Sequence, residues 1–207
     1  MSASDVPDTG PASAALRLAE TRIDGGTVWT GRFLQVQVDR ARLPDGSEGL
    51  REFIRHPGAS VVVPLFDDGR VLIERQWRYP LARAFVEFPA GKIDPGETPL
   101  ATAARELEEE TGWRAARIAH LTTIHNAIGY SDERIEVFVA RDLTRVTQRL
   151  DIEEFVECEL VRLDWLLDEV FAHRVTDVKT QIAALWLERI VSGRMPWPEF
   201  VGVAPPA

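Results

Sequence analysis

The stretch from Gly91 to Gly112 constrains the fold and the chemistry of this chain more than any other part. It reads Gly91, five residues, Glu97, seven residues, and then Arg105-Glu106-Leu107-Glu108-Glu109-Glu110-Thr111-Gly112. Thr98 suits the N-cap of a helix, and Pro99 suits the first helical position, where a missing N–H costs nothing. Gly112 suits the left-handed position just past the last turn. The stretch therefore predicts a glycine turn followed by one short helix.

The predicted helix buries one face and gathers carboxylates beside it. Its buried stripe, at helical spacing, consists of Leu100, Ala103, Ala104 and Leu107. With about 100° per residue, Glu106, Glu109 and Glu110 fall within an arc of roughly 100° beside that stripe. Glu108 points elsewhere, so we expect it to be a solvent residue. Carboxylates this close repel one another, and a hard divalent cation would remove the repulsion and use their oxygens as ligands.

Position by position, this stretch resembles the signature of the Nudix hydrolases, which cleave a nucleoside diphosphate linked to another group. A glutamate-rich run alone is most often a solvated face, but the fixed glycine, glutamate and arginine positions ahead of it favour the resemblance. The resemblance implies an enzyme that depends on Mg²⁺, with Mn²⁺ as a possible substitute. It also implies a Nudix-like α/β/α sandwich built on a mixed sheet.

The remaining sequence predicts the same fold class. Apolar runs predict strands at residues 33–43, 50–55, 59–66, 71–77, 85–88, 115–125, 135–140 and 155–163. Asp164 and Asp177 are predicted to cap two helices, which run to Ala172 and to about Ser192. Strands and helices in this order predict a mixed sheet with helices on its faces, an α/β (α+β) fold.

Breaks in the pattern divide the chain into four parts. We expect a disordered N-terminal tail at residues 1–17 and a Pro-rich C-terminal tail at 196–207. Residues 18–57 are predicted to form a small antiparallel β-unit, and residues 58–195 the Nudix domain. The resembling enzymes are usually dimers whose N-terminal sheet reaches across to the partner. Because two or three strands alone are barely stable, we expect the β-unit to be the dimerisation element of a homodimer.

Composition excludes several classes of partner. A net charge of −9 argues against a nucleic-acid groove or an anionic membrane surface. Bound cations would reconcile that charge with an anionic diphosphate substrate, because they invert the field at the site. No apolar run approaches the ~20 residues needed to span a bilayer. Since Cys158 is the only cysteine, a reducing compartment is expected, and we predict a cytoplasmic protein.

Fragments outside the signature resemble the ADP-ribose pyrophosphatase branch of the Nudix family. They are Gln76-Trp77-Arg78-Tyr79-Pro80, the run from Glu87 to Asp94, Arg51-Glu52 ahead of His56-Pro57-Gly58, Ser131-Asp132-Glu133, and Asp177-Val178-Lys179-Thr180. That branch commonly carries Ser-Pro-Gly where this chain has Ala127-Ile128-Gly129. The resemblance implies hydrolysis of ADP-ribose to AMP and ribose 5-phosphate. Another nucleoside diphosphate sugar, such as GDP-mannose, is the alternative, and a sensor that binds nucleotide without cleaving it is less favoured.

The resemblance also implies which residues hold the cations. The expected ligands are the backbone carbonyl of Ala90 and the side chains of Glu106, Glu109, Glu110 and Glu154. Arg105 is expected to pair with Glu97 and to orient the start of the helix. Glu153, on the same loop as Glu154, is the expected general base. The alternative is that Glu153 and Glu154 are ordinary loop acids.

Four further residues are candidates for substrate contacts. Arg78 is expected to clamp a phosphate bidentately, although a surface arginine would look the same in sequence. Arg51 matches less firmly, because Arg55 is an equal candidate. The loop at Gly129 is expected to line the pocket for the terminal sugar. Glu133 is expected to accept hydrogen bonds from a ribose hydroxyl, or to serve as the base if Glu153 does not.

Overall fold

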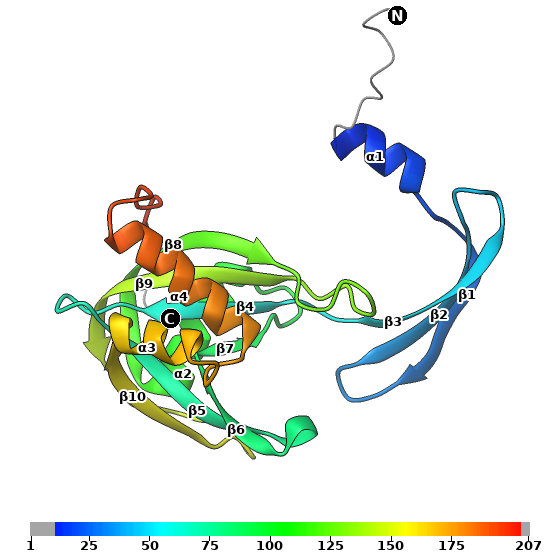
Figure 1. The fold of residues 1–207 in the computed structure, drawn as a ribbon. Helices are drawn as coiled ribbons and strands as arrows, with labels where there is room; N and C mark the ends of the chain where they lie inside the picture. The colour runs from blue at the N-terminus through cyan, green and yellow to red at the C-terminus, as the bar shows by residue number, and fades with distance from the viewer. Residues whose placement is uncertain (1–10, 204–207) are drawn as a thin grey trace, which may run out of the picture. The chain divides into compact units, whose positions relative to one another are not determined.

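The computed structural model describes residues 11–203, and the chain forms two compact units. Unit 1 consists of Met1–His56 with Ala127–Asp132, and unit 2 consists of Pro57–Asn126 with Glu133–Ala207. Figure 1 shows the elements of each unit along the chain. In the described part of the chain, no helix is long and apolar enough to cross a membrane.

Unit 1 is a small antiparallel sheet preceded by a helix. Its elements are α1 (Pro11–Leu18), β1 (Thr21–Thr30), β2 (Gln35–Arg42) and β3 (Glu48–Arg55), with strand order β1-β2-β3. The loop from Ala127 to Asp132 fastens onto β3, because the Ile54 amide donates to the Tyr130 carbonyl at 2.8 Å. The Asp132 amide donates in return to the Ile54 carbonyl at 3.2 Å. The predicted antiparallel β-unit is therefore present.

Two features of unit 1 differ from the sequence-based expectation. Helix α1 occupies residues that we expected to be a disordered tail, and residues 1–10 of that tail lie outside the described residues. Strand β1 was not predicted, because Gly25 and Gly26 interrupt its alternation. Gly25, at φ +130°, packs against β2, where a Cβ would lie 2.4 Å from Asp39 Oδ1. The register shifts on both sides of this glycine pair.

The described residues of unit 2, which end at 203, form two sheets and three α-helices. Its strands are β4 (Ala59–Pro64), β5 (Arg70–Arg78), β6 (Arg83–Glu87), β7 (Ala90–Lys92), β8 (Trp113–Ile124), β9 (Ile135–Arg145), β10 (Val156–Arg162) and β11 (Val201–Gly202). One sheet has the order β11-β8-β9-β4-β7 and the other β10-β5-β6. Strands β4 and β9 are parallel and all other pairs are antiparallel. The mixed sheet is as predicted.

The helices of unit 2 cover opposite faces of the larger sheet. They are α2 (Pro99–Thr111), α3 (Leu163–Phe171) and α4 (Val178–Val191), with a 3₁₀ turn, η1, at Tyr79–Leu81. Val62 of β4 packs with α2, whereas its neighbours Val61 and Val63 pack with α3 and α4. Alternate residues of one strand therefore enter two cores, as the period of two requires. Figure 1 shows α3 and α4 side by side in front of the strands, and the α/β/α sandwich is confirmed.

The helix ends test the capping predictions. Thr98 accepts a hydrogen bond from the Ala101 amide at 3.2 Å, and Gly112 ends α2 at φ 67°. Asp177 caps α4 by accepting from the Thr180 amide at 3.0 Å. These predictions are confirmed. Asp164 does not cap α3, because the helix already begins at Leu163 and Asp164 lies in its first turn.

The C-terminal residues were also expected to be a tail, and this is wrong for part of them. Val201 pairs with Ile118 of β8, so β11 adds an edge strand to the larger sheet. Residues 204–207 lie outside the described residues.

Candidate functional site

Helix α2 presses Glu106 against the glycine turn. A Cβ on Gly91 would lie 1.6 Å from Glu106 Oε1 and 2.0 Å from its Cδ. Only glycine leaves room for this carboxylate, which explains the residue at the head of the signature. The side chain of Glu106 is 13% exposed, so it is largely but not completely buried.

The same turn engages Glu110, one helical turn further along α2. The Ala90 amide donates to Glu110 Oε2 at 2.9 Å, and Glu110 is 2% exposed. Ala90 and Glu110, both expected at the cation site, are thus in direct contact.

Arg105 joins the helix to the segment before it. Its Nε and Nη2 donate to Glu97 at 3.0 and 3.1 Å, so the predicted pair is present. Its Nη1 lies 2.9 Å from both Glu106 Oε1 and Glu109 Oε2. One guanidinium therefore neutralises two of the three clustered glutamates as well as fixing the start of α2.

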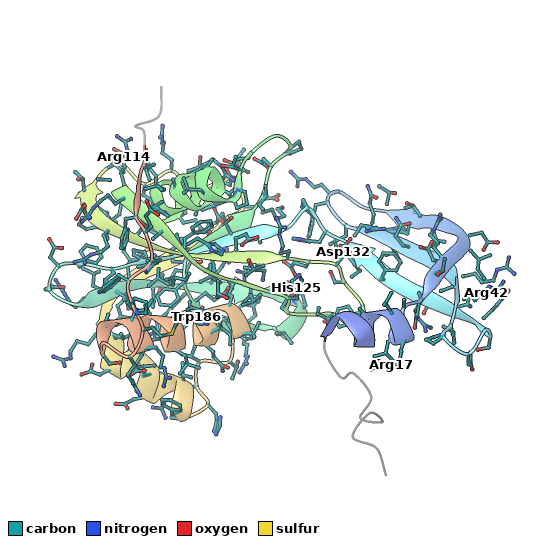
Figure 2. All side chains as sticks on the ribbon, turned by 90° about the horizontal axis from the view of Figure 1, so that it is seen from above. Arg17, Arg42, Arg114, His125, Asp132 and Trp186 are labelled. Carbon is teal, nitrogen blue, oxygen red and sulfur yellow. The ribbon has the colours of Figure 1, made fainter. Side chains whose placement is uncertain are left out.

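Glu108 corrects the expectation of a solvent residue. It is 8% exposed and accepts two hydrogen bonds from Arg114, both at 2.8 Å, and one from Arg149 at 3.2 Å. Arg114, labelled in Figure 2, follows the Gly112 turn. The chain reverses direction at this turn, and Arg114 and Arg149 cover the face of α2 that carries Glu108. The helical periodicity had predicted that this face is exposed to solvent.

We expect Glu108→Gln to destabilise the fold and spare catalysis. The substitution removes the charge that holds Arg114 and Arg149, so the melting temperature should fall by a few degrees. Because Glu108 lies off the carboxylate cluster, kcat should stay within about twofold of wild type. Thermal unfolding and steady-state kinetics on the same preparation check this. A loss of activity without a loss of stability would contradict it.

Sequence reasoning missed a buried ion-pair network beside the signature. Glu87 of β6 is 2% exposed and accepts two hydrogen bonds from Arg78, both at 2.7 Å. Lys179 of α4 also bonds to Glu87 and lies 3.1 Å from Asp177. Arg78, Glu87 and Lys179 all lie in fragments that resemble the ADP-ribose pyrophosphatase branch. Only the folded structure shows that these fragments contact one another. Arg78, the expected phosphate clamp, is held by Glu87 through Nε and Nη2 and keeps its other donors for a ligand.

A second buried acid, Glu74 of β5, was also missed. It is 0% exposed, and neither of its carboxylate oxygens has a hydrogen-bond partner among the described residues. The sequence carries a signal for it, since the acid directly follows the buried apolar run Val71-Leu72-Ile73. A charged residue at such a position calls for an explanation.

Burial and mutual repulsion raise the pKa of the clustered carboxyls. Burial raises the pKa of Glu106 to about 7, with Glu109 and Glu154 adding and Arg105 opposing. The pKa of Glu110 lies well above its ordinary value because of burial and the charges of Glu74, Glu106 and Glu154. The cluster therefore favours uptake of positive charge, as protons or as cations.

The two glutamates expected to supply a base and a further ligand, Glu153 and Glu154, lie on one loop but differ in their surroundings. The charge of Glu154 contributes, after burial, to the raised pKa values of Glu74, Glu106 and Glu110. Glu153 is exposed on the same loop, at φ 73°.

The remaining expected contacts fall in both units. Arg51 and Gly129 line one cavity of about 230 Å³ in unit 1. Arg51 donates to Glu20 at 2.6 and 2.5 Å. Arg55, the other candidate for this substrate contact, pairs with Asp132 at 2.7 Å. In unit 2, Glu133 accepts from Asn126 at 2.9 Å.

The site residues fit divalent cations. In the described part of the chain no three acidic, histidine or cysteine side chains already converge as a finished cage, since Glu106 and Glu109 bond to Arg105. The donors are nevertheless hard carboxylate oxygens, which Mg²⁺ and Mn²⁺ prefer. The carboxylate of Glu106 occupies the space over Gly91, and Glu74 adds two buried oxygens that have no hydrogen-bond partner among the described residues.

Comparison with known proteins decides the family. The NUDIX domain family matches residues 55–181, which include the whole carboxylate helix and the turn before it. The chain belongs to the Nudix family. It is therefore a Nudix hydrolase, acting on a nucleotide-type substrate in a family that typically uses a divalent metal.

Several relatives of this Nudix hydrolase are similar over most of its length. It is 38% identical over 173 residues to the ADP-ribose pyrophosphatase of Bacillus subtilis (strain 168), covering 83% of this chain and 94% of that protein. It is 37% identical over 171 residues to the methanol dehydrogenase activator of Bacillus methanolicus, covering 82% and 92%. A crystal structure of an ADP compounds hydrolase superposes with a TM-score of 0.75 at 22% identity, over 84% of this chain and 95% of that chain. The last likeness supports the fold.

We expect the affinity for Mn²⁺ to rise between about pH 6 and pH 8. The carboxyls of Glu106 and Glu110 have raised pKa values, so at the lower pH a cation must displace protons that are absent at the higher pH. In the cation-free protein, the raised pKa of Glu106 contributes stability that is complete below its ordinary value of 4.5 and lost as the pH rises through about 7. Titration calorimetry at three pH values measures the affinity. An affinity that does not change with pH would contradict the expectation.

Proposed function

We propose that this Nudix hydrolase cleaves the diphosphate bond of ADP-ribose, in a Mg²⁺-dependent reaction, to AMP and ribose 5-phosphate. The observation that carries the proposal is the packing of Glu106 on Gly91 beside buried Glu110. That packing concentrates carboxylate charge at one turn, as a diphosphate-binding cation site requires. The substrate follows the relative named ADP-ribose pyrophosphatase, from Bacillus subtilis (strain 168).

In this proposal the cations are held by the Ala90 carbonyl, Glu106, Glu109, Glu110 and Glu154. When bound, they neutralise the phosphoryl oxygens and acidify a water. Mn²⁺ replaces Mg²⁺ at the same oxygen ligands.

The other proposed roles belong to residues of the chain. Arg105 and Glu97 hold α2 against the turn, so the glutamates keep their positions during turnover. Glu153 accepts the proton of the attacking water, and Glu133 is the second candidate for that role. Arg78 contacts a phosphate through the donors that Glu87 leaves free.

Unit 1 is proposed to contribute substrate contacts of its own. Arg51 and Gly129 line the same cavity, and the loop of Gly129 is fastened to β3 by backbone hydrogen bonds. This cavity is proposed to take the terminal sugar. Because the loop reads Ala127-Ile128-Gly129 rather than Ser-Pro-Gly, GDP-mannose and other nucleoside diphosphate sugars remain the alternative substrates.

A panel of nucleoside diphosphate sugars tests the assignment. Each compound is incubated with the protein and Mg²⁺, and in parallel with chelator, and products are resolved by chromatography. ADP-ribose should rank among the best substrates by kcat/KM, with activity only in Mg²⁺. If GDP-mannose has the higher kcat/KM, it replaces ADP-ribose as the assigned substrate. Tight nucleotide binding in Mg²⁺ without any cleavage over hours would support a sensor instead of an enzyme.

We also propose a homodimer, formed through unit 1. Large apolar side chains are exposed on α1 and on the three-stranded sheet: Leu16 at 84%, Leu18 at 71%, Val28 at 62%, Trp29 at 55% and Leu50 at 66%. Large exposed apolar side chains are found at interaction surfaces when they form a patch, and the proposal is that these residues do so in the dimer. The lone cysteine, Cys158, suits the proposed cytoplasmic setting, where disulfides are rare.

Light scattering should give twice the mass of one chain. Leu50→Asp should shift the protein toward the monomer, because a charge replaces apolar surface in the proposed contact. Phe171→Asp, a change at an equally exposed site on α3 of unit 2, is the control and should leave the mass unchanged. A wild-type protein with the mass of one chain would contradict the proposed homodimer.

A further inference from the structure

Glu74 is the buried group that the proposed roles leave unexplained. The side chain is fully buried, and both carboxylate oxygens lack a partner among the described residues. Burying a carboxylate without a partner is strongly unfavourable. Such a residue persists where it serves a ligand or a reaction.

The strand register shows which way Glu74 faces. Its direct partners are Glu87 on β6 and Cys158 on β10, and side chains opposite one another on antiparallel strands share a face. The Cys158 thiol donates to the carbonyl of Glu110 at 3.5 Å. This face of β5 is therefore turned toward the end of α2, where Glu110 lies.

Charge balance leaves Glu74 without a protein counter-ion of its own. The cations that act on it are Arg78 and Lys179, and both are bonded to Glu87. Arg105 is bonded to the glutamates of the signature. Glu110 is also buried, at 2% exposed, and its carboxylate accepts a hydrogen bond from the Ala90 amide rather than from a cationic side chain.

We propose that Glu74 is a further member of the divalent-cation site and gives a carboxylate oxygen to an ion that Glu110 also holds. The inference rests on the proposed function for the presence of the ion. Glu74 comes from β5, outside the signature and outside the loop of Glu154. It extends the site across to the smaller sheet, and one shared cation would relieve the repulsion between two buried acids.

Mn²⁺ binding in the absence of nucleotide tests the proposal. Free Mn²⁺ is counted by electron paramagnetic resonance for the wild type, Glu74→Gln and Glu159→Gln. Glu159 is the matched control, since it neighbours Cys158 on β10 but points to the other face, where it is 54% exposed and pairs with Arg75. Glu74→Gln should bind one ion fewer per chain, or bind with a Kd raised on the order of tenfold or more, while Glu159→Gln should match wild type.

Thermal unfolding separates a ligand from a merely structural residue. In chelator, Glu74→Gln should melt close to the wild-type temperature, because the acid that it replaces makes no hydrogen bond among the described residues. Added Mn²⁺ should raise its melting temperature less than that of wild type. Glu74→Asp, which keeps the charge but withdraws the oxygens, should show the same loss of Mn²⁺ binding and covers the case in which the amide variant does not fold.

The outcomes distinguish this inference from the proposed function. If Glu74→Gln binds Mn²⁺ with the wild-type number and Kd, the inference is overturned even when the wild type cleaves ADP-ribose. If binding is lost in both Glu74 variants but the wild type cleaves no diphosphate, the inference stands and the proposed function falls.

Discussion

Glu110→Gln is expected to lower kcat on the order of 10³-fold or more, about 4 kcal/mol of transition-state stabilisation, and to leave the fold intact. The side chain is 2% exposed, and its Oε2 accepts from the Ala90 amide. Glutamine keeps the size and can still accept that hydrogen bond through its amide oxygen, but it removes the charge that binds the cation. Steady-state kinetics with ADP-ribose measures the loss.

The matched control lies two residues away on the same helix. Glu108→Gln removes a carboxylate that is also buried, at 8% exposed, but whose partners are arginines rather than the cation cluster. In chelator, Glu110→Gln should melt no lower than wild type, since it removes a repelled charge, whereas Glu108→Gln should melt lower. Equal losses of kcat in both variants would mean that the carboxylate cluster of α2 does not hold the catalytic cations.

Gly91→Ala is the second substitution with a large expected effect, on the order of 10²-fold in kcat. The new Cβ would overlap Glu106 Oε1 and Cδ, at 1.6 and 2.0 Å. Glu106 is a flexible side chain and can turn away without moving the backbone, so the fold should survive while the carboxylate leaves its position. Kinetics and Mn²⁺ binding should both report the displacement.

Gly202→Ala is the control for that substitution. No atom lies within 4 Å of the Cβ it would add, so stability and kcat should remain those of wild type. Full activity in Gly91→Ala would show that the position of Glu106 against the turn does not matter for the reaction.

Local chemistry made the central helix predictable. Thr98, Pro99 and Gly112 each suit one position of a helix end. In the structure they occupy those positions at the two ends of α2. The Arg105–Glu97 pair followed from the resemblance and is also present. Such features depend on neighbours within about two turns, which the sequence displays directly.

Long-range pairing made other features unpredictable. Glu108 is covered partly by Arg149, which comes from beyond the next two strands, and no periodicity reveals that contact. Glu74 meets Glu87 only through the register of β5 with β6. Strand β1 was not predicted because Gly25 and Gly26 interrupt the alternation of apolar and polar residues that indicates a strand.

Phosphorus NMR of ADP-ribose incubated with the protein tests the central claim most directly. With Mg²⁺, the diphosphate resonances should disappear while two phosphomonoester resonances, those of AMP and ribose 5-phosphate, grow in equal amounts. With chelator, or with Glu110→Gln in Mg²⁺, the diphosphate should persist on the same timescale. A diphosphate that stays whole with the wild-type protein and Mg²⁺, or that is cleaved equally well in chelator, would contradict the account.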